Sequence, residues 1–184
     1  MKSINNRKVI TYFFASMVTF IILYGPYLTY FHLLMGNTFG ASPFIIGVIM
    51  SCMSIVTGVT ASQLGKLAKL IPEKKLLNIS FALYALALII FPFISKLWLL
   101  LIPTVIFGIA HGINFPTVHS LLAGFVPLEH RAAFMSINGM VLRLGQTAGP
   151  ILMGAVFLFW GMSGTFYAGA ILSAGMAFLL LILI

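Results

Sequence analysis

Long apolar segments separated by short polar connectors make up most of the chain. Six segments contain about 20 or more mainly apolar residues, the length that a helix needs to cross a hydrocarbon core of about 30 Å. The connectors are a few residues long and hold Gly, Pro, Ser and nearly all of the charges. The pattern predicts six transmembrane helices, at residues 9–35, 42–64, 76–94, 98–125, 132–160 and 163–184.

The segments do not show the periodicity of strands. Residues 82–91 read ALYALALIIF, without the period-two alternation of an outer-membrane barrel. The chain is 61% hydrophobic with a mean hydropathy of +1.16, more than a soluble core can bury. The sequence therefore predicts an all-α membrane protein with one six-helix domain over residues 1–184. The first segment is longer than a signal peptide and no A-x-A-like site follows it, so we expect it to be retained.

Basic residues gather in the connectors of one predicted side. Three precede the first helix, four follow the second and Arg131 lies between the fourth and fifth, whereas the opposite side holds only Lys96. Because Lys and Arg in short loops tend to stay inside, we expect both termini to be cytoplasmic, in a bacterial or archaeal cell membrane. Trp98 and Trp160 fall at the opposite boundary, where amphipathic rings prefer to lie. This topology accounts for the formal net charge of +8, so the bilayer is the expected partner and nucleic-acid binding is not expected.

The six predicted helices differ in polarity. Those at 76–94 and 163–184 are almost purely apolar, whereas the other four carry Tyr, Thr, Ser, His, Asn, Gln and one Arg. Polar groups at membrane depth normally face protein or a water-filled cavity. Each set of three helices thus resembles two cavity or interface helices followed by a peripheral one. This 3+3 pattern is typical of the repeats in secondary transporters.

Two stretches resemble the major facilitator superfamily. Residues 112–154 (GINFPTVHSLLAGFVPLEHRAAFMSINGMVLRLGQTAGPILMG) are similar to its tenth and eleventh helices, including a P-x-x-x-R connector. Residues 65–75 (GKLAKLIPEKK) resemble its cytoplasmic loop motif, which Gly65, Lys74 and Lys75 match. Lys69 stands where the family has Asp and Pro72 where it has a second Gly, so the charge relay of that loop is not carried over in full.

The resemblance implies the carboxyl-terminal half of a twelve-helix transporter. It covers the whole chain, and the amino-terminal six helices of that fold are absent from it. It implies transport of a small solute, driven by an ion or solute gradient through the rocking of one half against the other. The chain would need its missing half or a second copy. The alternative is a membrane bundle that acts by interaction or regulation, without transport of its own.

Glycines on the predicted fourth and fifth helices form two GxxxG pairs, and such pairs let another helix approach closely. The pairs are Gly108 with Gly112 and Gly145 with Gly149. Gly149, Pro150 and Gly154 also form a glycine-proline motif that resembles the one in antiporter members of the superfamily, where it belongs to the fifth helix of the first half. It favours drug efflux by proton antiport, and simple helix packing is the alternative interpretation.

Arg143 is the most informative polar residue. It lies 12 residues after Arg131, about 18 Å along a helix and so near the bilayer centre. No acidic residue of the chain lies in a membrane segment, so its partner would be a carbonyl, water, an anionic ligand or a carboxylate of the other half. Gln146 lies on the same stripe of the helix. Arg143 either stabilises the bundle or contacts substrate.

Five further residues are candidates for the cavity wall. His111 and Asn114 lie one turn apart in mid-membrane, where a histidine could pass protons or simply hydrogen-bond within the bundle. Tyr24, Tyr27 and Tyr30 surround Gly25-Pro26, where proline can kink the helix. If these tyrosines line a cavity they favour a bulky, partly hydrophobic substrate; the alternative is that they fill gaps between helices.

The sequence holds no signature of an enzyme, cofactor or metal site. Cys52 is the single cysteine. Two mid-membrane histidines without carboxylates or thiols nearby are weak evidence for a metal site. No nucleotide-binding G-x-x-x-x-G-K-[ST] loop is present in the sequence. Residues 161–164 imitate the G-x-S-G of rhomboid-type proteases, but no histidine follows position 130 to complete that site. We therefore expect no enzyme activity, catalytic residue, cofactor or metal.

Overall fold

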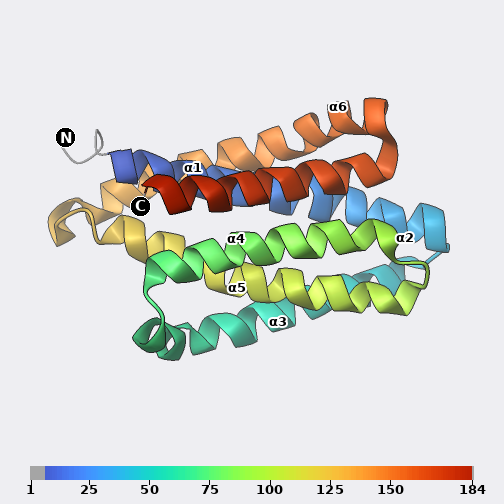
Figure 1. The fold of residues 1–184 in the computed structure, drawn as a ribbon, viewed down its shortest axis with the longest axis horizontal. Coiled ribbons are helices and arrows are strands. Elements are labelled where there is room, and N and C mark those ends of the chain that lie inside the picture. The colour runs from blue at the N-terminus through green and yellow to red at the C-terminus, as the bar shows by residue number, and fades with distance from the viewer. Residues whose placement is uncertain (1–6, 184) are drawn as a thin grey trace.

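Helices account for almost all of the computed structural model, which describes residues 7–183 (Figure 1). Within that range no strand is present, so the predicted all-helical class is confirmed. The elements, in chain order, are α1 (Arg7–Ile22), the π-helix η1 (Leu23–Phe31), α2 (His32–Phe39), α3 (Pro43–Leu70), α4 (Glu73–Ile90), the short 3-10 helices η2 (Phe91–Phe93) and η3 (Leu97–Leu100), α5 (Leu101–Ala123) and α6 (Leu128–Leu183). Five helical stretches are long and apolar enough to cross a membrane.

The first apolar stretch is one uninterrupted helical rod formed by α1, η1 and α2. Pro26 lies inside the π-helical part, because a proline lacks the N–H that the regular ladder needs and wider turns accommodate this gap. Thr29 Oγ1 donates to the Tyr24 carbonyl oxygen at 2.7 Å and so satisfies one of the displaced acceptors. The rod ends at Gly40, whose φ of 61° is the left-handed conformation that glycine adopts freely.

The second helix is longer than the sequence pattern predicts. α3 begins after the capping residue Ser42 and continues to Leu70, whereas the predicted end is residue 64. The stretch 65–75, expected to be a loop, is therefore mostly helical, and only Ile71 and Pro72 connect α3 to α4. The reason is that lysines prolong a helix as readily as leucines do, so the first residue able to stop it is Pro72.

The last helix, α6, consists of two arms that reverse at Gly161. This residue has φ 66° and ψ −165°, a backbone conformation essentially reserved for glycine. The first arm runs from Leu128 to the reversal, and the second arm returns alongside it to the end of the described chain (Figure 1).

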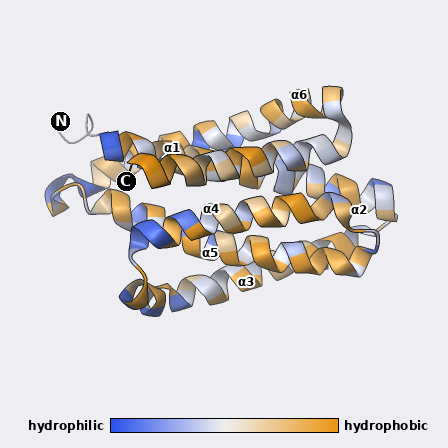
Figure 2. Cartoon of the chain, viewed as in Figure 1, coloured by the Kyte–Doolittle hydropathy of each residue, from blue (hydrophilic) through white to orange (hydrophobic). Residues whose placement is uncertain are grey.

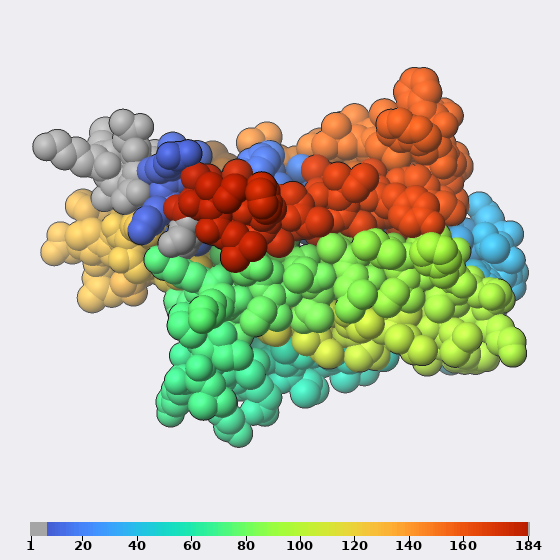
Figure 3. All heavy atoms as spheres, viewed as in Figure 1, coloured from blue at the N-terminus to red at the C-terminus, as the bar shows by residue number. Residues whose placement is uncertain are grey.

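α4 and α5 occupy the middle of the bundle. α3 packs on α5, whereas α6 packs on α4 and on α1, so that α3 and α6 flank the two sides (Figure 3). The central and flanking helices differ sharply in burial. About half of the most apolar window of α4 and of α5 is buried, whereas only 11% of that window is buried in α3. An apolar helix with so little burial still has most of its surface available for lipid or for other helices.

Polar residues gather at one end of the bundle. The start of α1, the α3–α4 connection and the α5–α6 connection all lie at this end, and hydrophilic residues concentrate there (Figures 1 and 2). These segments carry Arg7, Lys8 and the lysines and arginine of both connections, whereas the α4–α5 connection with Lys96 and the reversal of α6 lie at the opposite end. The helices therefore give the bundle one strongly basic end, which we call the basic end.

Candidate functional site

A buried polar network joins three helices at mid-length. Thr19 of α1 donates through Oγ1 to Asn114 Oδ1 at 2.7 Å, and Asn114 Nδ2 donates to Ser80 Oγ of α4 at 2.8 Å. All three side chains are at least 98% buried. Because both ends of the Asn114 amide are satisfied by protein, this residue stabilises the bundle and does not point into an open cavity.

His111 also points toward α4. Its Nδ1 lies 2.6 Å from the hydroxyl oxygen of the fully buried Tyr84, so the two groups share one hydrogen bond. The ring is only partly buried, and its centroid lies 5.9 Å from that of Phe115 in a stacked arrangement. His111 therefore connects the interior of the bundle with a more open surface.

That surface is a row of aromatic rings from α1, η1 and α5, which we call the aromatic row; its members are Tyr24, Phe20, Phe115, His111 and His119. Tyr24 stacks on Phe20 at 5.6 Å, and Phe20 lies 6.1 Å from Phe115. Phe115 in turn lies 4.3 Å from His119, measured between ring centroids. Phe115 is 38% exposed, so the row presents a flat apolar surface with histidines at two positions. Sequence reasoning missed Phe20 and Phe115, although the four-residue spacing of His111, Phe115 and His119 places them on one face of a helix.

The arm of α6 that carries Arg143 passes beside this row. A Cβ atom on Gly145 would lie 3.1 Å from Phe20 Cβ, so the helices touch there. Arg143 is exposed, and its Nη1 donates to Gln146 Oε1 at 2.9 Å. Among residues 7–183 no carboxylate faces the guanidinium, so most of its hydrogen-bonding capacity is open to a ligand or another helix.

The three tyrosines of the first rod have different surroundings. Tyr27 is 1% exposed and stacks on Phe107 at 4.3 Å, and Tyr30 packs against Phe157 at 5.4 Å. Both rings therefore fill space between helices. Only Tyr24, which belongs to the aromatic row, remains as a candidate for a cavity wall, and its ring is partly exposed.

The glycine pairs lie at helix crossings. Cβ atoms on Gly145 and Gly149 would come within 3.0 Å of α1 and η1 backbone atoms, and those on Gly108 and Gly112 within 3.0 Å of α3. The Thr57 hydroxyl of α3 donates to the Gly108 carbonyl oxygen at 3.1 Å across one of these crossings. The motif continues inside α6 with Pro150 and with Gly154, where an added Cβ atom would be at an ordinary contact distance, 3.6 Å, from the Tyr30 hydroxyl.

The residues of the family's loop motif lie at the basic end. Gly65 is exposed on α3, where an added Cβ atom would meet no neighbour within 4 Å, and Lys74 and Lys75 lie in the first turn of α4. None of them belongs to the aromatic row, whose rings come from α1, η1 and α5.

The chain belongs to the major facilitator superfamily, because its sequence matches the Major Facilitator Superfamily profile over residues 9–184. It is 27% identical over 168 residues to the multidrug resistance protein MdtG of Salmonella arizonae and of Salmonella newport, covering 89% of this chain and 41% of each relative. It is 28% identical over 131 residues to a probable anion transporter 5 of Arabidopsis thaliana, covering 71% of this chain and 28% of the relative. The chain thus spans less than half the length of these curated relatives. The resemblance found in the sequence is confirmed, and the protein is an integral membrane protein.

Proposed function

We propose that this chain is one half of a secondary active transporter that moves a small solute across the membrane. The observation that carries the proposal is the exposed Arg143–Gln146 pair on the arm of α6 whose Gly145 contacts Phe20 of the aromatic row. A guanidinium at membrane depth is costly when it faces lipid, and such residues mark substrate or ion pathways. A surface that combines this charge with exposed aromatic rings fits a cavity wall.

The other wall of the cavity comes from a second six-helix unit, either an amino-terminal half or a second copy. Support comes from α3, whose exposed face carries Gly47, Gly58 and Gly65 with open space around each. Small residues let helix backbones approach closely in lipid. This face is therefore suited to pack against another bundle, as in transporters built from two rocking units.

The topology follows from the same proposal. The two arms of α6 each cross the membrane, which gives six crossings arranged as a 3+3 repeat in a single domain over residues 1–184. The basic end faces the cytoplasm of a bacterial or archaeal cell, since Lys and Arg of short connections stay inside. Trp98 and Trp160 then lie at the outer interface.

The substrate class that fits the aromatic row is bulky and partly hydrophobic, because Phe115 and Tyr24 offer stacking surfaces without fixed directional groups. The printed name of MdtG, a multidrug resistance protein, supports the same class. Proton antiport is the coupling we infer, with His111 and its hydrogen bond to Tyr84 as the group within this chain that can exchange a proton.

A chimera tests this proposal. The part of the Salmonella MdtG protein that matches this chain is replaced by the chain, and ethidium export is followed in cells that lack their own exporters. We expect export that a protonophore abolishes. Arg143→Ala reduces export at least tenfold with unchanged membrane insertion, whereas the matched control Lys96→Ala, which removes one positive charge at the opposite end, does not. Equal export by both variants would remove Arg143 from the site.

The second candidate function is an interaction bundle that regulates or assembles with another membrane protein. The observation that favours it is the open glycine face of α3. Under this alternative the inserted chimera exports no ethidium, yet Gly58→Leu abolishes co-purification of the partner. Under the transport proposal, export and assembly are lost together in that variant.

A further inference from the structure

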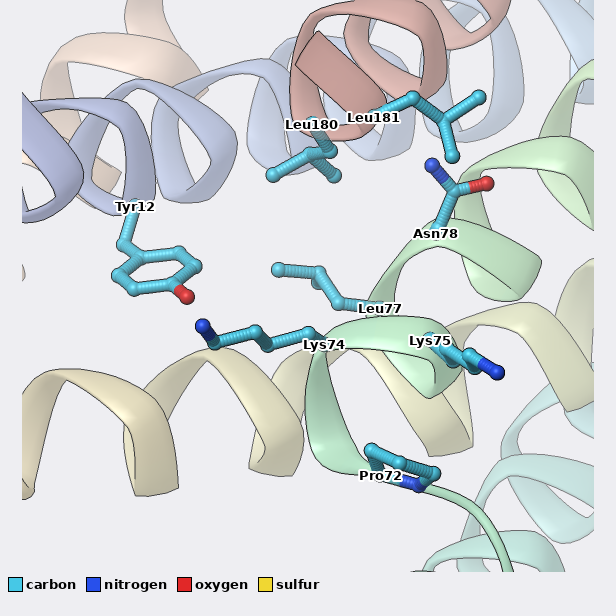
Figure 4. Close-up of a pocket in the computed structure, with 8 residues that line it drawn as sticks. All are labelled: Tyr12, Pro72, Lys74, Lys75, Leu77, Asn78, Leu180 and Leu181. Carbon is cyan, nitrogen blue, oxygen red and sulfur yellow. The ribbon is translucent and has the colours of Figure 1, made fainter. Parts of the chain in front are cut away.

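A cavity lies at the basic end between α1, α4 and the second arm of α6. Its volume is about 270 Å³. Residues from these three elements and the α3–α4 connection line it: Tyr12, Pro72, Lys74, Lys75, Leu77, Asn78, Leu180 and Leu181 (Figure 4). It is separate from the aromatic row and shares no residue with the proposed transport site.

One side of this cavity is polar and unsatisfied. Tyr12 is 1% exposed, and its hydroxyl has no hydrogen-bond partner among the described residues. In Figure 4 this hydroxyl points toward the ammonium group of Lys74 across the cavity. A buried hydroxyl without a partner costs free energy, so its presence indicates that a group from outside the described residues completes it.

The electrostatics of the cavity favour an anion. Lys74 and Lys75 form no ion pair within residues 7–183, and the first turn of α4 carries no side-chain cap on its N–H groups. The nearby carboxylate, Glu73, already accepts a hydrogen bond from Ser120 Oγ at 2.7 Å. The Lys74 ammonium and the Tyr12 hydroxyl therefore point toward each other near the amino terminus of α4, while the Lys75 side chain extends the other way (Figure 4), and the one nearby carboxylate is partly engaged elsewhere.

The remaining wall is apolar. It is formed by Leu77 of α4 and by Leu180 and Leu181 near the end of the second arm of α6 (Figure 4). A free inorganic anion gains nothing from such a wall, whereas a lipid places its phosphate among the basic groups and its acyl chain along the leucines.

We propose that this cavity binds the headgroup of an anionic phospholipid. The phosphate accepts hydrogen bonds from the Tyr12 hydroxyl and the Lys74 ammonium, Lys75 adds a second positive charge at the rim, and one acyl chain lies against Leu180 and Leu181. The bound lipid links α1 to α4 and to the second arm of α6 at the basic end.

Native mass spectrometry of the purified, delipidated full chain tests this inference. The probes are dioleoylphosphatidylglycerol, dioleoylphosphatidylcholine and inorganic phosphate. We expect phosphatidylglycerol to bind at least tenfold more tightly than phosphatidylcholine, without competition from millimolar inorganic phosphate. Each lysine near an anionic surface contributes about a fivefold change in affinity, so the double variant Lys74→Gln/Lys75→Gln loses most of the preference.

The matched control is Lys66→Gln/Lys69→Gln, which removes the same charge from α3 at the same end, outside the cavity. It retains the preference if the cavity is the site. Equal loss in both double variants overturns the proposal, because it shows diffuse attraction only; competition by inorganic phosphate overturns the lipid as the source of the anion. Tyr12→Phe weakens phosphatidylglycerol binding about threefold without lowering the melting temperature, since it removes an unpaired hydroxyl.

Discussion

Gly112→Ala should loosen the contact between α5 and α3. A Cβ atom at residue 112 would lie 2.6 Å from the Thr57 carbonyl oxygen and 2.7 Å from Thr60 Cβ, whereas ordinary contact begins at 3.4 Å. Because these are backbone and Cβ atoms, no side-chain rotation relieves the clash. α3 must retreat by about 0.8 Å, the shortfall at the Thr57 oxygen.

The free-energy cost follows from two contributions. Overpacking of a close contact costs about 1–3 kcal/mol. Retreat of α3 also weakens the hydrogen bond from Thr57 to the Gly108 carbonyl oxygen, 3.1 Å long, which is worth about 0.5–1.5 kcal/mol. Alanine recovers up to about 1 kcal/mol through its better helix propensity. We therefore expect a net loss of about 1–3 kcal/mol in the free energy of unfolding.

Gly58→Ala is the matched control, because Gly58 lies on α3 with no neighbouring atom within 4 Å of the added Cβ. Helix propensity alone predicts that it stabilises the chain by about 0.5–1 kcal/mol. Both variants are unfolded with SDS in mixed micelles, followed by far-ultraviolet circular dichroism. If Gly112→Ala proves as stable as Gly58→Ala, the close approach of α3 and α5 described above is refuted.

Three further outcomes are expected. Gly161→Ala costs about 1–2 kcal/mol in the same unfolding assay, because φ 66° strains any other residue, whereas Gly175→Ala, in open space, is neutral or stabilising; equal effects would argue against the reversal. Asn114→Ala costs about 1–3 kcal/mol because it removes the two buried hydrogen bonds through which its amide joins α1 to α4, and no loss would show that water replaces the amide. Arg143→Leu favours membrane insertion of the isolated chain by about 3 kcal/mol, measured with glycosylation tags, and an unchanged insertion free energy would show that the guanidinium is already shielded.

The sequence pattern predicts the apolar helices and the family well because both rest on local signals. Apolar runs of sufficient length, broken by Gly and Pro, are readable residue by residue, and the reversal at Gly161 lies in the expected connector. The predicted end of α3 is wrong because the charges of Lys66 and Lys69 look like a loop, although lysine is a good helix former.

The site is less predictable because it depends on which face each helix turns inward. Asn114 and His111 both satisfy their polar groups on α4, through Ser80 and Tyr84, and no local pattern marks those two residues as their partners. Tyr27 and Tyr24 are three residues apart in one rod, yet one is buried on Phe107 and the other lies in the aromatic row. Such differences come from tertiary packing, which a single sequence does not record.

The reversal at Gly161 has a consequence for biosynthesis. The arm before it carries Arg143, which on its own enters a bilayer reluctantly. The arm after it, residues 162–183, contains no charged residue and is strongly apolar. Because a single glycine joins them, the two arms can enter the bilayer together as a hairpin, in which the apolar second arm offsets the cost of inserting the first.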